Sequence, residues 1–133
     1  MLDALLDAGA DIDAPGAVIA GGTALADATA FAQWRAAFRL VDRGATTTSF
    51  TAAALGLTDR VRGHLAASPA DLDDAFWAAC HGGRLDTARY LANEGADLNR
   101  VAPWEPVTPL DAATRAGAAD VVAWLRDHGA RSA

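Results

Sequence analysis

Two short patterns recur along the chain, and this internal repetition is the feature that most restricts its fold. An apolar stretch that ends in Gly-Ala occurs four times, at residues 5–10, 40–45, 91–96 and 125–130. The outer intervals are about 35 residues long, and the middle one has room for two short units if Ser68 and Pro69 replace a glycine. A period of this size is typical of proteins that stack helix pairs.

The second pattern lies between the Gly-Ala positions. Residues 108–117 align without gaps with residues 74–83 and 23–32, and more loosely with residues 47–56. A glycine in this pattern suits the left-handed end of a first helix. An acidic residue follows three of these glycines and suits the N-cap or first turn of a second helix, at Asp59, Asp86 and Asp120. The pattern therefore predicts pairs of helices joined by glycine turns.

We expect one all-α domain over residues 1–133, a helix-turn-helix solenoid of about four to five repeats. The expected helices lie near residues 2–8, 23–31, 34–43, 48–55, 58–67, 73–81, 85–94, 109–116 and 119–128. The connection between Gly44 and Thr47, and that between Pro69 and Asp74, is too short for an extended segment. Longer connections remain at residues 11–22 and 97–107.

Composition predicts a thin core. The chain is 52% hydrophobic, but alanine supplies about a quarter of the residues, and it buries little area while favouring helices. Asp27, in the middle of an apolar helix, would need an ion-pair partner such as Arg35 or Arg39. The core column should contain Leu5, Leu40, Leu65, Leu91 and Leu125, facing Leu25, Phe76, Leu110, Ala28, Ala79 and Ala113.

Charge and cysteine content exclude several classes of function. The net charge of -6 argues against nucleic acid and anionic membranes as partners, because both attract clustered cations. The N-terminus lacks the basic region of a signal peptide, and no apolar run is long enough for a membrane span. A single cysteine, Cys80, cannot form an internal disulfide. We expect a soluble, cytoplasmic protein.

The first residues predict an incomplete repeat. Met1 falls within what would be the second helix of a pair, so Leu2, Leu5 and Leu6 form an apolar stripe without a first helix to cover it. Such a stripe invites association. We therefore expect either a shortened form of a longer protein or self-association through these three leucines.

The sequence offers little catalytic chemistry. Cys80 and His81 are adjacent, and adjacent side chains on a helix diverge by about 100°, so they would not meet as thiolate and base. His64, His81 and His128 lack the spacing of metal ligands. The carboxylates at Asp71, Asp73 and Asp74 suit helix capping and solvation. We expect no metal and no cofactor.

Residues 108–113, followed by Gly117 and by Gly129-Ala130, resemble the ankyrin repeat, which begins with a TPLH-type helix start and closes on GAD. Residues 95–99 and 9–13 also match that family's junction between a helix and the extended connection called a finger. The resemblance covers essentially the whole chain, which is also similar to a group of short actinobacterial ankyrin proteins. It implies a concave binding face that includes Thr29, Trp77, Cys80, His81, Thr114 and Arg115, with Trp104 and Glu105 from the finger.

The favoured function is therefore a non-catalytic protein-protein interaction module, with a partner of basic or mixed charge. One alternative is a small-molecule-binding protein or unusual small enzyme, with a pocket near Asp27, Trp77, Cys80, His81 and Trp104. Another is a subunit that enters a larger assembly through its N-terminal stripe.

Overall fold

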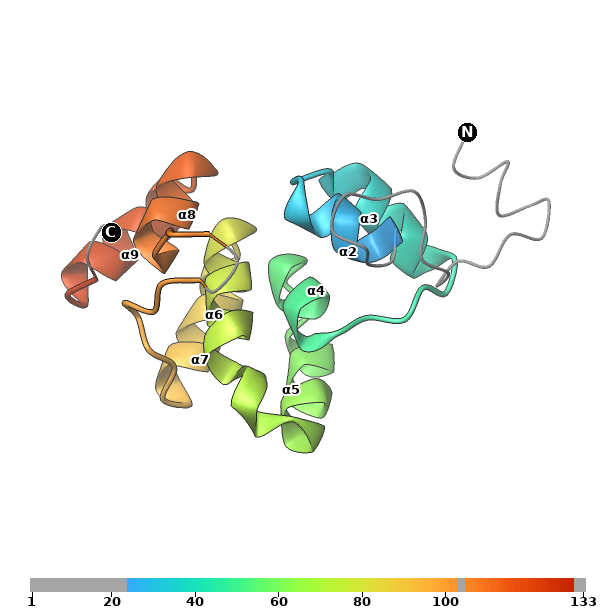
Figure 1. Cartoon of the computed structure of the whole chain (residues 1–133), viewed down its shortest axis with the longest axis horizontal. Helices are drawn as coiled ribbons and strands as arrows, with labels where there is room; N and C mark the ends of the chain where they lie inside the picture. Colours follow the sequence, from blue (N-terminus) through green and yellow to red (C-terminus); the bar gives the residue numbers. More distant parts are fainter. Residues whose placement is uncertain (1–23, 103–104, 131–133) are drawn as a thin grey trace. The chain divides into compact units, whose positions relative to one another are not determined.

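A computed structural model describes residues 24–102 and 105–130, and this part of the chain consists of helices and turns without strands (Figure 1). The chain divides into two compact units, Met1–Thr47 and Thr48–Ala133. Each described unit is built from helix pairs joined by tight turns, which confirms the predicted all-α class. The bounds of the described helices agree with the expected ranges to within about two residues, as is usual at helix ends.

The first unit contains α2 (Ala24–Ala30) and α3 (Trp34–Asp42), which pack against each other. Leu25 and Leu40 are buried, as predicted for the core column. The predicted ion pair of Asp27 with Arg35 or Arg39 is wrong, because no such pair joins these residues within the described unit. Instead, Asp27 is half-buried, and its Oδ1 atom has no hydrogen-bond partner.

The second unit contains three helix pairs. In each pair the first helix contacts the second. The first helices also pack side by side, α4 (Ser49–Ala54) against α6 (Leu72–His81) and α6 against α8 (Pro109–Arg115) (Figure 1). The unit therefore has one row of first helices backed by its second helices. The elements are α4 (Ser49–Ala54), α5 (Thr58–Ala67), the 3-10 turn η1 (Pro69–Asp71), α6 (Leu72–His81), α7 (Leu85–Asn93), α8 (Pro109–Arg115) and α9 (Ala119–Asp127).

The helices begin in two different ways. Thr48 and Thr108 each start a first helix with a reciprocal capping box, which satisfies two backbone donors that the helix leaves unpaired. The second helices of this unit begin without a side-chain cap. They carry an acidic residue in the first turn instead, where its charge complements the helix dipole. This confirms the predicted first-turn position of Asp59, Asp86 and Asp120.

A glycine with positive φ follows each of the three first helices of this unit, at Gly56, Gly83 and Gly117. Gly56 and Gly83 have φ of 75° and 69°, a region that glycine adopts at little cost, so the predicted left-handed ends are confirmed. Gly82 lies so close to α4 that a Cβ atom there would overlap the carbonyl oxygen of Ala54. Arg84 Nε donates a hydrogen bond to that same oxygen at 3.0 Å. The close contact between α4 and α6 therefore requires glycine at position 82, because any other residue would place a Cβ atom against Ala54.

The core of the second unit follows the predicted column with one exception. Phe76, Leu91 and Leu125 are fully buried, but Leu65 is only half-buried, so its place in the core column was wrong. After α5 the chain turns directly into η1 and α6 through the exposed Ser68 and Pro69, whereas α7 and α9 are each followed by a Gly-Ala pair whose alanine is buried. The predicted absence of a finger at this junction is confirmed.

Several expectations concern residues outside the described part of the chain. They include the N-terminal half repeat, the core residue Leu5, and the stripe of Leu2, Leu5 and Leu6. Self-association through that stripe, the single domain over residues 1–133 and the cytoplasmic location stay predictions. Among the described helices, none combines the length and the apolar character that a membrane crossing would require.

Candidate interaction site

The site is built around the finger that connects α7 to α8, residues 97–107, of which residues 97–102 and 105–107 are described. Asn99 N donates to the Asp97 carboxylate at 2.9 Å, which forms a local turn at the start of the finger. Its two limbs are joined where Ala102 N donates to the carbonyl oxygen of Val107 at 3.1 Å. The finger is thus an internally bonded loop.

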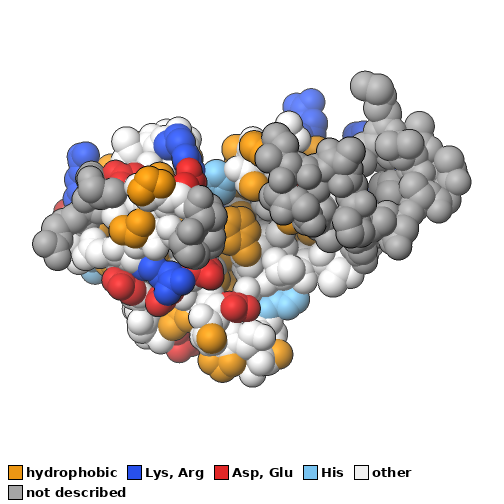
Figure 2. Space-filling model, viewed as in Figure 1, with side chains coloured by type: hydrophobic (Ala, Val, Ile, Leu, Met, Phe, Trp, Pro, Cys, Tyr) orange, Lys and Arg blue, Asp and Glu red, His pale blue; other side chains and the backbone are white. Residues whose placement is uncertain are grey.

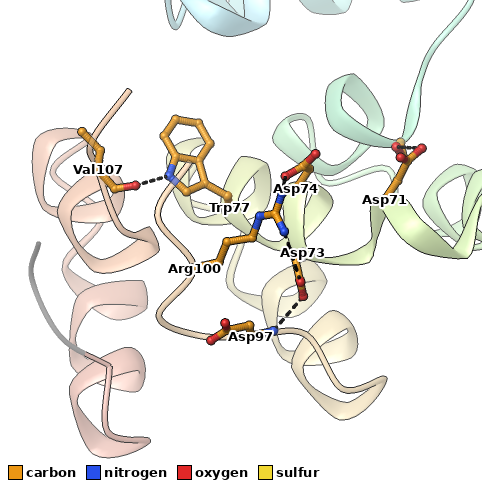
Figure 3. Close-up of polar contacts among 8 residues, drawn as sticks. Asp71, Asp73, Asp74, Trp77, Asp97, Arg100 and Val107 are labelled. Atoms are coloured by element: carbon orange, nitrogen blue, oxygen red, sulfur yellow. Dashed lines mark hydrogen bonds and ion pairs between the residues drawn. The ribbon is translucent and has the colours of Figure 1, made fainter. Parts of the chain in front are cut away.

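Trp77 on α6 anchors this finger. Its indole Nε1 donates to the carbonyl oxygen of Val107 at 3.0 Å, the same oxygen that accepts from Ala102 (Figure 3). The Trp77 side chain is 2% exposed and packs with Ala102 and Ala112 in one apolar cluster, against which Val107 also packs. A buried tryptophan needs a partner for its N–H, and here that partner is the finger backbone.

An aromatic row crosses the first helices beneath the finger. Phe50 on α4 stacks on Trp77 with ring centroids 6.1 Å apart, and Trp77 stacks on His81 at 5.3 Å. His81 is buried at 6% exposure. The row links α4 to α6, so the support of the finger extends over two neighbouring helix pairs.

The far limb of the finger is held at its surface by an ion pair. Arg115 at the end of α8 makes two hydrogen bonds to the Glu105 carboxylate, at 2.9 and 3.1 Å. Hydrogen bonding from Arg115 lowers the pKa of Glu105, and the charge of His81 acts in the same direction, against a smaller effect of burial. The same bonds raise the pKa of Arg115. Both side chains remain accessible, at 51% for Arg115 and 32% for Glu105.

The near limb is held by carboxylates at the start of α6. Arg100 lies 3.2 Å from an oxygen of Asp74 and 3.6 Å from one of Asp73, and Asp73 also accepts a hydrogen bond from Asp97 N at 2.9 Å (Figure 3). The neighbouring Asp71 accepts from Ser49 Oγ at 3.2 Å. Figure 2 shows basic side chains bordered by acidic ones on this face. The finger is therefore fixed at both limbs.

The comparison with known families agrees with this architecture. The family model for ankyrin repeats, in three copies, matches residues 49–132, which is more than half of the chain. The chain belongs to the ankyrin repeat family. Ankyrin repeats are generally protein-protein interaction modules. No curated protein matches the sequence.

The residues predicted for the ankyrin binding face separate into two groups. Thr114 and Arg115 are exposed at the end of α8, and Glu105 is partly exposed on the finger. Trp104 lies outside the described residues. The structure buries the other four, Thr29, Trp77, Cys80 and His81.

Burial limits what those four residues can do, because a side chain with little accessible surface has little area with which to contact a partner. The hydroxyl of Thr29 bonds back to carbonyl oxygens of its own helix, at 2.9 and 3.1 Å. Burial raises the pKa of the Cys80 thiol well above its ordinary value, which disfavours the thiolate that a nucleophile requires. Trp77 contacts the finger from below, and His81 stacks on Trp77.

The alternative pocket stays untested. Asp27 belongs to the first unit, whereas Trp77, Cys80 and His81 belong to the second. Within the part of the chain that the structure describes, no three His, Cys, Asp or Glu side chains come together as a metal site would require.

The sequence interpretation missed Phe50 and Arg100. The repeat alignment carried a signal for Phe50, since residues 47–56 aligned with residues 74–83 place it at the position of Trp77 one repeat earlier. Equivalent positions on neighbouring first helices lie side by side in a stacked array. Arg100 had no such signal, because its partners depend on how the finger folds.

Proposed function

We propose that this chain is a non-catalytic protein-interaction module that binds its partner with the finger and the adjoining end of α8. The observation that supports the proposal is the fixation of the finger. Trp77 donates a hydrogen bond to the backbone of the finger at Val107. Asp73 and Asp74 form ion pairs with Arg100 on the near limb, and Arg115 forms one with Glu105 on the far limb. A loop that is already ordered loses less conformational entropy on binding, which favours affinity.

The proposed contact residues are those with accessible side chains on this surface. They include Glu105, Thr114 and Arg115, and Val101 adds an apolar side chain that is 49% exposed. Trp104 belongs to the proposed set from its place in the finger. Trp77 and His81 act from beneath, through the finger they support. The net charge of -6 favours a protein partner of basic or mixed charge over nucleic acid.

The test is affinity capture from a lysate of the source cells, with quantitative mass spectrometry. Thr114→Arg combined with Arg115→Glu changes the size and charge of exposed side chains without altering the buried core. We expect proteins captured by the wild type to be reduced at least about tenfold in this variant, as for loss of an interface hot spot.

The matched control is Arg89→Glu, which reverses an exposed charge on α7, away from the finger and the end of α8. It should capture the same proteins as the wild type, and circular dichroism should show both variants folded. Equal capture by the finger variant and the control would contradict the proposal.

A further inference from the structure

A groove on the side of the second helices has an apolar lining that the proposed function leaves unused. It lies where α5, η1 and α6 meet α7 and has a volume of about 350 Å³. Figure 2 shows hydrophobic side chains at the lower end of the view, where Figure 1 places the junction of α5 and α6. Its apolar lining includes Leu65, Pro69, Leu72 and Tyr90.

The leucine at this point of the repeat is less covered in α5 than in the other second helices of the unit. Leu91 and Leu125 occupy the equivalent position in α7 and α9, and both are fully buried. Leu65 is half-buried in α5, and Pro69 beyond it is exposed. An apolar side chain that the repeat elsewhere buries therefore stays open to solvent at this one place.

Opposite charges stand at the border of the groove. Arg62 on α5 lies over the ring of Tyr90, with its guanidinium carbon 4.8 Å from the ring centroid. Glu94 follows the end of α7 and is exposed. Among the described residues, neither Arg62 nor Glu94 takes part in an ion pair. One apolar surface thus carries one positive and one negative charge that the second unit leaves unneutralised.

We propose that the occupant of this groove is a second copy of the chain, bound across a two-fold axis. In a two-fold dimer the same surface faces itself, so a contact from one residue to another is made twice. Arg62 would then face Glu94 of the partner subunit, and Glu94 would face Arg62 of the partner subunit. The apolar lining would pack between the two ion pairs. A surface with both charges at its border is complementary to its own copy, which an all-basic or all-acidic border would not be.

The size of the surface limits its affinity. Stable interfaces usually engage about 20–30 residues on each side, many more than this groove provides. We therefore expect a weak dimer, with a dissociation constant on the order of 10–100 µM.

Sedimentation velocity of the full chain, from low micromolar to roughly millimolar concentration, tests this dimer. Arg62→Glu and Glu94→Arg each place like charges opposite one another, so each should raise the dissociation constant at least about tenfold. The double variant restores opposite charges and should return the constant to within about threefold of the wild type. This recovery separates a direct pair from general damage to the fold.

Arg89→Glu is the matched control, since Arg89 is exposed on α7 but does not line the groove. It should leave the dimer unchanged. A wild type that stays monomeric at every concentration would overturn the proposal. So would a dimer that the single variants leave intact, or a double variant that stays monomeric. The finger variant with Thr114→Arg and Arg115→Glu should dimerise normally, so either proposal can fail without the other.

Discussion

The turn between α2 and α3 contains the non-glycine residue with a positive φ among the described residues, Ala32 at 57°. The repeat alignment places Ala32 at the position of Gly117, whose φ is 71°. A side chain in this left-handed region costs about 1–2 kcal/mol because its Cβ atom crowds the backbone. The turn therefore has the left-handed conformation of the other repeats, but with an alanine, which disfavours that conformation, in place of glycine.

We therefore expect Ala32→Gly to stabilise the first unit by about 0.5–1 kcal/mol, after allowance for the greater freedom of glycine in the unfolded chain. Hydrogen exchange of the Gln33 amide, which bonds to Ala28 O at 2.7 Å, measures this turn directly. Ala30→Gly, at the exposed end of α2, is the control and should destabilise the helix. Faster exchange of Gln33 in Ala32→Gly would contradict the strain argument.

We expect substitution by alanine to have opposite effects on stability at Gly82 and at Gly63. Gly82→Ala brings a methyl group against the carbonyl oxygen of Ala54, so α4 and α6 must separate. We expect destabilisation of about 2–3 kcal/mol, as for other overpacked sites. Gly63 lies within α5 and has open space around its Cα atom. Gly63→Ala should therefore stabilise by about 0.5–1 kcal/mol.

Urea unfolding followed by circular dichroism measures both changes. If the two variants shift the midpoint in the same direction, the close approach of α6 to Ala54 does not govern the stability of this contact. Arg84→Met measures the contribution of the hydrogen bond separately from the steric effect, because it removes the bond to Ala54 O but adds no clash at Gly82.

At the scale of elements, the Glu105–Arg115 ion pair contributes to the stability of the finger, and this contribution decreases as the pH falls. The pKa of Glu105 is lower in the folded chain than in the unfolded one. Its contribution to stability is therefore full above the unfolded pKa, about 4.3, and is lost as the pH falls through the folded pKa. Because both side chains are partly exposed, we expect no more than about 1 kcal/mol.

A double-mutant cycle with Glu105→Gln and Arg115→Gln, measured by urea unfolding at pH 7 and near pH 3, isolates the pair. We expect a coupling energy at pH 7 that disappears at the lower pH. Coupling of equal size at both values would mean that the two residues interact by some means other than charge.

The helices and turns were predictable because their signals are local. Glycine positions, first-turn acids and apolar spacing depend on a few neighbouring residues, and the structure follows them closely. The finger was less predictable, since Arg100 meets Asp73 and Asp74 across a long sequence separation. Leu65 has the same place in the apolar spacing as Leu91 and Leu125, so the spacing alone could not show that it would be less buried.

The burial of Trp77 and His81 was also hard to judge from sequence. A polar or aromatic residue on the inner helix of a repeat can either face a partner or lie beneath a finger, and the sequence pattern is the same. Whether the side chain is exposed or buried depends on how closely the finger packs over the inner helix. Here Trp77 bonds to Val107 O, so the finger covers Trp77.

At the scale of the whole molecule, the second unit contains three helix pairs and the whole of the segment that matches ankyrin repeats. Stacked arrays usually need about three repeats to be stable, because each repeat buries its apolar face against its neighbours. We therefore expect residues 48–133 to fold without the first unit.

Expression of residues 48–133 tests this expectation. The fragment should show helical circular dichroism and a single cooperative thermal transition. A fragment without cooperative unfolding would show that the two units depend on each other for stability, and would favour the single domain expected over residues 1–133.

The complete burial of Cys80 makes it a built-in reporter for this unit. The chain holds one cysteine, in the last turn of α6, and its thiol has no accessible surface in the closed structure. A thiol reagent can reach it only when α6 separates from its neighbours. The rate of labelling therefore reports how often the middle of the array opens, and a partner or second copy that holds the array closed should slow that rate without touching the sulfur.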